Sequence, residues 1–320
     1  MRIGSNYSKE FQRIVEIYER AGGDAANLLK GDVASIIVSG QKVLGLNNVR
    51  GVSMESFSKD DVVIVKINVG DRVHIPSPTH LCVGALDKVG EQRIRFEIEV
   101  GEESEISFLS HCSFPFADDF AHIMEAVFHL RKGAKVFYED HHFHSDSGGT
   151  KVRTSYSVIL DTKSHFENRF YLTRTRVGRL ELDMESHNNG EGSVVHLETK
   201  VYERADDRVE VREKLYLNAP ESSGILKTAI FATDSSYANV VNEAYGNAPH
   251  VRGHVECREI VKGDEVQVGT IPVLRMRYDT SELTHEASIG RVNAKQLQTL
   301  MAKGLTEDEA TELIVKGMLR

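Results

Sequence analysis

The chain has 320 residues, of which 40% are hydrophobic and 27% charged, so it can bury one large core or two smaller ones. Its 39 basic and 48 acidic residues give a formal net charge of −9, which argues against unaided binding to nucleic acid or an anionic membrane. The N-terminal residues contain no apolar signal segment, and no apolar run reaches the roughly 18 residues of a membrane span. We therefore expect a soluble, cytoplasmic protein.

The first segment, residues 1–60, is expected to begin with helix. Ser8 is a typical N-cap residue, and the apolar residues that follow it recur with helical spacing before two glycines at 22–23: Phe11, Ile14, Val15 and Tyr18. Residues 24–31 predict one more short helix. From residue 32 the composition turns to β-branched residues and glycine.

Residues 61–280 are expected to form a strand-rich core. Short segments alternate apolar and polar side chains, and clusters such as SDSGG and NNGEG separate them. The segment HIMEAVFHL, residues 122–130, is helical by composition, but its alternation predicts a strand. So many strands are typical of a sandwich, a barrel or a β-solenoid. No hexapeptide or nonapeptide repeat selects the solenoid, although the strands are many for one sandwich.

The last segment, residues 281–320, predicts a helical hairpin. Asn293 can cap a first helix, and Thr306 with Glu309 forms the T-x-x-E capping box of a second. Both helices carry an apolar face. Such a face either packs on the body of the protein or docks a partner.

Three cysteines, Cys82, Cys112 and Cys257, are present without C-x-x-C spacing. The set is neither a disulfide framework nor a self-contained zinc site, and the default interpretation of each is a small buried hydrophobe.

Cys257, His285 and Glu286 together offer a thiolate, an imidazole and a carboxylate, which suit iron or zinc. In a β-solenoid, positions about 29 residues apart lie on neighbouring coils, which would bring Cys257 near the 285–286 pair. Adjacent residues on a strand point to opposite faces, so His285 and Glu286 would not both meet Cys257 directly. The alternative is a surface ion pair plus a buried thiol.

Cys112 follows His111 in ISFLSHCSF, and a neighbouring imidazole can lower the pKa of a thiol. The alternative is a buried cysteine at a strand end.

The segment EDHHFHSDSGG places His141, His142 and His144 between Asp140 and Asp146. On a strand, His142 and His144 would share a face and could chelate a metal. A histidine-rich loop at a subunit boundary without metal is an equal alternative, and the sequence leaves both open.

The C-terminal stretch HEASIGRVNAKQLQTLMAKGLTEDEATELIVKGML resembles the signature of the SufB/SufD family of iron–sulfur cluster assembly proteins. VHIPSPTHLCVG and ISFLSHCSFPFADDF are similar to family segments as well, and the resemblance spans most of residues 24–320. It implies a mainly β fold: a right-handed parallel β-helix between N-terminal and C-terminal α-helical segments, with the hairpin as an ATPase docking site.

The resemblance also implies a scaffold role. Cys112 matches the family cysteine that receives persulfide sulfur, and Cys257, His285 and Glu286 match the positions where a transient iron–sulfur cluster forms. Implied partners are a SufC-type ABC ATPase, a second copy of the chain in a homodimer, a sulfur donor and apo acceptor proteins. ATP hydrolysis would belong to the SufC-type subunit, so the chain itself is not expected to be an enzyme.

Two departures and two alternatives accompany this interpretation. Residues 269–272 read G-T-I-P where family scaffolds carry H-T-F-P, and Thr284 stands where many carry a carboxylate. One alternative is a SufD-like structural paralogue that supports assembly without holding the main cluster. The other is a β-helix enzyme acting on polysaccharide, against which the absence of Trp and the 7% aromatic content count.

Overall fold

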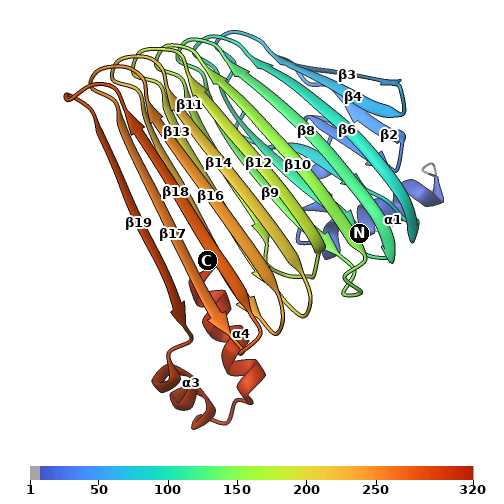
Figure 1. Ribbon diagram of the computed structural model, residues 1–320. Coiled ribbons are helices and arrows are strands. Elements are labelled where there is room, and N and C mark those ends of the chain that lie inside the picture. The colour runs from blue at the N-terminus through green and yellow to red at the C-terminus, as the bar shows by residue number, and fades with distance from the viewer. Residues whose placement is uncertain (1–7, 320) are drawn as a thin grey trace.

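Two sheets run side by side through residues 8–319, the part of the chain described by this computed structural model (Figure 1). From β4 onward, successive strands alternate between the sheets, and each pairs in parallel with the strand two places along the chain. The ten-stranded sheet has the spatial order β19 (Glu282–Arg291), β17 (Arg252–Lys262), β15 (Ser223–Thr233), β13 (Val194–Glu203), β11 (His165–Leu172), β9 (Lys135–His144), β7 (Glu105–Phe114), β5 (Thr79–Gly84), β1 (Ser35–Ser39) and β2 (Lys42–Asn47). The nine-stranded sheet has the order β18 (Gln267–Met276), β16 (Tyr237–Gly246), β14 (Arg208–Leu217), β12 (Gly178–Asn188), β10 (Thr150–Leu160), β8 (Asp119–Leu130), β6 (Val89–Val100), β4 (Val62–Val69) and β3 (Val52–Lys59). The mainly β fold and the parallel β-helix are confirmed.

One coil takes about 29 residues, and equivalent positions on successive coils stack. Asn247 donates to Asn218 and Asn218 donates to Asn189, each pair 29 residues apart, at 2.8 and 2.9 Å. This asparagine ladder joins successive coils at one exposed corner of the β-helix.

The N-terminal end of the β-helix is covered. α1 (Lys9–Arg20) begins at Ser8, whose side chain accepts from the Phe11 backbone N–H, and α2 (Ala25–Leu28) follows. Both helices were expected. Tyr18 and its apolar neighbours on α1 pack against Ile37 and Cys82 of the ten-stranded sheet. The antiparallel hairpins β1–β2 and β3–β4 also lie at this end, so residues 1–60 contain strands as well as helices.

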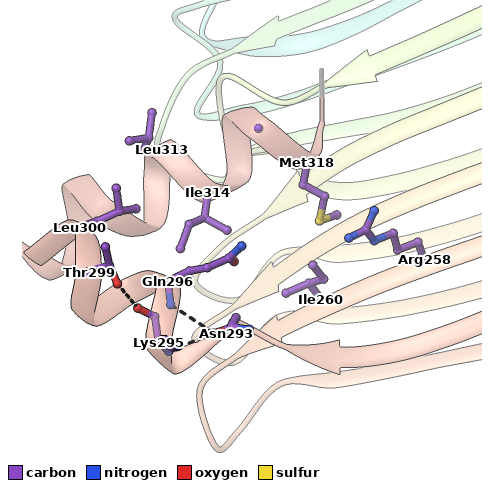
Figure 2. A pocket seen from close by; sticks show the side chains of 11 residues that line it. Arg258, Ile260, Asn293, Lys295, Gln296, Thr299, Leu300, Leu313, Ile314 and Met318 are labelled. Atoms are coloured by element: carbon purple, nitrogen blue, oxygen red, sulfur yellow. Dashed lines mark hydrogen bonds between the residues drawn. The ribbon is translucent and has the colours of Figure 1, made fainter.

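The C-terminal end carries the expected helical hairpin, α3 (Ala294–Met301) and α4 (Glu307–Met318), capped by Asn293 and by the Thr306–Glu309 capping box. β19 precedes it and forms an edge of the ten-stranded sheet. The hairpin and β17 enclose a groove of about 670 Å³ (Figure 2). Among residues 8–319, no helix has the length and apolar character to cross a membrane.

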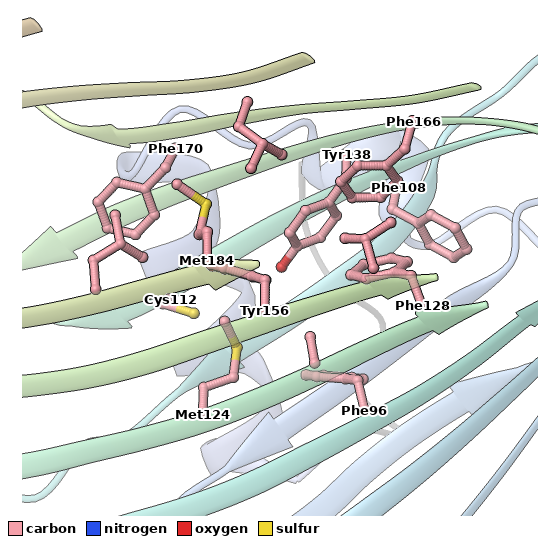
Figure 3. Close-up of a cluster of buried hydrophobic side chains, with 14 of the residues drawn as sticks. Phe96, Phe108, Cys112, Met124, Phe128, Tyr138, Tyr156, Phe166, Phe170 and Met184 are labelled. Carbon is pink, nitrogen blue, oxygen red and sulfur yellow. The ribbon is translucent and has the colours of Figure 1, made fainter. Parts of the chain in front are cut away.

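Alternation along the strands builds one continuous apolar core between the sheets. The segment 122–130 is an example of this alternation, because it belongs to the strand β8, in which every second side chain is buried. Aromatic rings fill the middle of the core (Figure 3), where Phe128 lies 4.9 Å from Phe166 and 6.3 Å from Phe108 between ring centroids. Interlocking rings of this kind leave little room for substitution.

Phe166→Ala should lower the free energy of unfolding by about 3–5 kcal/mol, because it opens a cavity among fully buried rings. Urea unfolding followed by circular dichroism measures this. Phe137→Ala is the matched control, since Phe137 is 37% exposed on the neighbouring strand and should cost less than about 1 kcal/mol. Equal losses for the two variants would contradict the packing described.

Candidate functional site

Cys257 lies inside the C-terminal end of the β-helix. It lies in β17, which is next to the edge strand β19, and only 1% of its surface is exposed. Burial raises the pKa of its thiol to about 12. The thiol is therefore protonated at neutral pH, and it would ligate a metal only with loss of that proton.

A buried polar network leads inward from Cys257. Asn242 on β16 donates to the Cys257 sulfur at 3.4 Å and to Glu213 at 3.1 Å. Thr199 and Thr228 donate to the two carboxylate oxygens of Glu213 at 2.6 and 2.9 Å. Burial raises the pKa of Glu213 to about 7, while these donors oppose the shift. The lumen next to Cys257 is thus polar and hydrogen-bonded rather than apolar.

The structure separates the two residues that follow Thr284. β17 and β19 are neighbours, as the spacing of 29 residues predicts, with Val255 opposite His285 and Cys257 opposite Ala287. His285 therefore shares the inner face with Cys257, one position away diagonally. Glu286 lies opposite Glu256 on the outer face and is exposed. Of the two, only His285 lies on the same face as Cys257 within one chain.

His285 is suited to bind a cation. Burial, and then the neighbouring His254, lower the pKa of His285, which favours the neutral imidazole that binds metals. Its Nε2 atom is buried and has no hydrogen-bond partner within residues 8–319.

Glu259 is a further inward-facing group that sequence reasoning missed. It lies two residues after Cys257 on the same face of β17, and it is 1% exposed. Neither of its carboxylate oxygens has a partner in the described part of the chain, and burial raises its pKa to about 7. The sequence does contain a signal for Glu259, because it stands two residues after Cys257 in a predicted strand, and residues two apart on a strand share a face. Cys257, Glu259 and His285 thus share one inner face at the C-terminal end of the β-helix, although their ligand atoms do not all lie within 4.8 Å of one another.

Cys112 lies in β7, far from this set. β9, β11, β13 and β15 separate β7 from β17, which corresponds to about 24 Å at the usual spacing of strands. The thiol is fully buried in the lumen, and burial, followed by the charge of Asp140, raises its pKa well above the ordinary value.

The interpretation of His111 as an activator of Cys112 is wrong. His111 points to the outer face, where its ring packs 4.6 Å from Tyr18 of α1 and stacks 4.9 Å from His141. Burial lowers the pKa of His111 to about 3, so it carries no positive charge near the thiol. The neighbours of Cys112 are instead Ser110 and Asp140, at 4.0 and 3.8 Å from its sulfur.

Comparison with known proteins supplies the family. The family model "SUF system FeS cluster assembly, SufBD core domain" matches residues 86–318. The chain belongs to the SufBD family. An iron–sulfur cluster assembly SufBD family protein of Pyrococcus horikoshii is 45% identical over 321 residues, covering 100% of this chain and 96% of that protein. One of Methanocaldococcus jannaschii is 35% identical over 311 residues, covering 97% of this chain and 98% of that protein.

Membership of the SufBD family confirms the resemblance and makes the chain an iron–sulfur cluster assembly protein. An Archaeoglobus fulgidus member is 27% identical over 259 residues, covering 78% of this chain and 66% of that protein. An assembly role agrees with a set of thiol, imidazole and carboxyl groups at one end of the SufBD β-helix, since these are ligands that iron accepts.

Glu259 should make stability fall as pH rises. Its folded pKa of about 7 lies above the roughly 4.3 of an unfolded chain, so the folded state holds a proton between these values and loses stability across that window. We expect the advantage of Glu259→Gln over wild type in free energy of unfolding to grow from pH 5 to pH 8. Urea unfolding at both values measures it.

Glu256→Gln is the control for this prediction, because Glu256 lies on the outer face of the same strand and pairs with Lys227 at 3.4 Å. It should show no such growing advantage. An advantage for Glu259→Gln that stays constant between the two pH values would contradict the placement of Glu259.

Proposed function

We propose that this chain is a scaffold for de novo iron–sulfur cluster assembly, and that the nascent cluster binds at the C-terminal end of the β-helix through Cys257 and His285. The observation that carries the proposal is the shared inner face of these two residues on neighbouring strands. One soft thiolate and harder nitrogen or oxygen ligands bind a cluster less firmly than four thiolates, which suits a product that must be released. The cluster is cargo, and the chain is not itself an enzyme.

Glu286 is proposed to act at the boundary between two copies of the chain. It faces away from Cys257 within its own chain, and it lies on the edge strand β19, whose backbone groups on one side have no strand partner. Exposed apolar side chains surround this end of the two sheets: Ile271, Leu274, Met276 and Ile289. A homodimer formed by this end would cover them and would place Glu286 at the subunit boundary.

Cys112 is proposed as the acceptor of persulfide sulfur, an assignment supported by its match to the family position. Its thiol is enclosed by the β-helix and has a raised pKa. A sulfur donor would therefore reach it only through an opening of the lumen, and transfer requires the thiolate. Apo acceptor proteins would then receive the finished cluster in the cytoplasm.

Cys257→Ser should reduce the iron and sulfide that remain bound after anaerobic reconstitution by at least about tenfold, because the oxygen of serine is a poor substitute for thiolate sulfur. Metal and sulfide analysis with Mössbauer spectra measures the cluster. Cys82→Ser is the control, since Cys82 is equally buried but packs against α1 at the other end. Undiminished iron and sulfide in Cys257→Ser would refute the site, and a wild type that holds neither would favour the SufD-like paralogue.

The helical hairpin is the proposed docking site for a SufC-type ABC ATPase. α4 is anchored to the body through Val315 and Leu319, which pack against Tyr202 and Phe231, whereas α3 has no buried residue. The groove between the helices and β17 is lined by apolar side chains from both helices (Figure 2), among them Leu300 and Leu313. Leu313 is 50% exposed, so this apolar surface is available to a partner.

Leu313→Asp should weaken binding of a SufC-type subunit about 10- to 100-fold, because it places a charge in the apolar groove. Isothermal titration calorimetry measures the affinity. Met301→Asp is the matched control, since Met301 is 41% exposed on α3 but does not line the groove. Unchanged binding by Leu313→Asp would place the ATPase elsewhere.

A further inference from the structure

A second set of possible ligands lies inside the β-helix, away from Cys257. The Cys112 sulfur, the Asp140 carboxylate and a ring nitrogen of His142 all lie within 4.8 Å of one another, and all three residues are buried. Cys112 and His142 are directly opposite on β7 and β9, and Asp140 precedes His142 by two residues on the same inner face. The register of the two strands, not proximity in sequence, assembles this set.

The hydrogen bonds of His144 fix which nitrogen of His142 faces Asp140. His144 Nδ1 lies 3.2 Å from the Arg176 carbonyl oxygen, which only accepts, so Nδ1 carries the hydrogen of a neutral His144. Its bare Nε2 then accepts from His142 Nδ1 at 3.3 Å. A neutral His142 is consequently left with a bare Nε2, and this atom faces Asp140 Oδ2 at 3.2 Å.

His142 Nε2 lies 3.2 Å from Asp140 Oδ2, which also accepts from the Tyr156 hydroxyl, and the site is sealed from water. The Cys112 thiol donates to the other oxygen of Asp140 at 3.8 Å. A proton on His142 Nε2 or a metal ion between the ring nitrogen and the carboxylate would each satisfy this contact. The metal ion is favoured by the presence of a third ligand type, the Cys112 sulfur, within 4.8 Å of both other ligand atoms.

The distances suit a four-coordinate ion. Metal bonds of about 2.0–2.3 Å at tetrahedral angles separate neighbouring ligand atoms by about 3.3–3.6 Å. The observed separations are 3.2 Å from nitrogen to oxygen and 3.8 Å from sulfur to oxygen. A thiolate and a carboxylate would also balance the two charges of a divalent ion, which a buried site requires.

His122 supplies independent support. It is fully buried on β8, and neither of its ring nitrogens has a hydrogen-bond partner within residues 8–319. Its ring centroid lies 6.0 Å from that of His142. A fully buried imidazole without partners is costly, so the lumen beside His142 has an unmet demand for a polar or metal partner.

We propose that Cys112, Asp140 and His142 bind one divalent transition-metal ion of the zinc or iron class inside the β-helix, next to the unpaired imidazole of His122. His144 and the Arg176 carbonyl hold His142 in the tautomer that leaves Nε2 free for the metal. The bound ion displaces the proton of the Cys112 thiol and keeps it as thiolate at neutral pH.

This site is distinct from the one at Cys257. Two fully buried apolar side chains, Phe170 and Met184, lie in the lumen between Asp140 and the Glu213 network. Phe170 is the strand neighbour of Asp140 on one side and of Thr199 on the other. In the opposite sheet, Met184 is likewise the strand neighbour of Tyr156 and of Glu213. Figure 3 shows both side chains close to Cys112 and Tyr156. The two polar compartments are therefore separated by apolar side chains, and the inference does not depend on the proposed scaffold role.

The test is cobalt substitution of the full chain, produced in cobalt-supplemented medium so that the ion can enter during folding. We expect one cobalt per chain, with a sulfur-to-cobalt charge-transfer band and the strong visible absorption of a four-coordinate site. Cys112→Ser should remove the charge-transfer band. His142→Gln should lower the cobalt content at least fivefold. If circular dichroism shows that His142→Gln does not fold, Asp140→Asn replaces it and should lower the cobalt content in the same way.

Cys82→Ser and Cys257→Ser are the matched controls, and both should keep the cobalt and the band. Wild type without cobalt would overturn the site and assign a second proton to His142. A band that survives in Cys112→Ser but disappears in Cys257→Ser would also overturn it, while leaving the scaffold proposal intact. Zinc and iron analysis of protein from unsupplemented medium then identifies the native ion.

Discussion

The structure depends on the parallel, in-register pairing of each strand with the strand one coil away. Coils of 28 to 31 residues repeat closely enough that equivalent positions stack across several neighbours, as the asparagine ladder shows. Since side chains alternate between faces, this register decides for every residue whether it enters the lumen or faces outward. A slip of one residue would exchange the core with the surface.

Burial of polar groups in the lumen is costly, and the β-helix meets this cost in two different ways. Around Glu213, two threonine hydroxyls and the Asn242 amide donate to the carboxylate, so both oxygens of Glu213 are satisfied, although the Asn242 carbonyl oxygen has no partner within residues 8–319. Around Asp140, the Cys112 sulfur and a His142 nitrogen come together with the carboxylate, and His122 has no partner in the described part of the chain. The first arrangement is a hydrogen-bonded network, whereas the second has the ligand types of the proposed metal site.

The two ends of the β-helix differ in how far they are covered. At the N-terminal end, α1 and two antiparallel hairpins cover the first coils, which is how a solenoid protects an exposed end. At the C-terminal end, β18 and β19 remain sheet edges with exposed apolar side chains beside them. Cys257, His285 and Glu286, the residues matched to cluster binding, lie at this uncovered end, which is consistent with a site completed by another chain.

The sequence by itself determined the local elements. The caps at Ser8, Asn293 and Thr306, the strand alternation that reveals β8, and the family motifs at residues 285–319 all depend on residues close together in the chain. The spacing of 28 residues between Cys257 and His285, together with the β-helix that the family resemblance implies, even placed the two on neighbouring coils. Only the tertiary structure decided that Cys112 meets Asp140 and His142 rather than His111, and that His285 rather than Glu286 shares the inner face with Cys257. These outcomes follow from pairing between strands about 30 residues apart, whose register is set by the packing of the whole coil and leaves no mark in the local sequence.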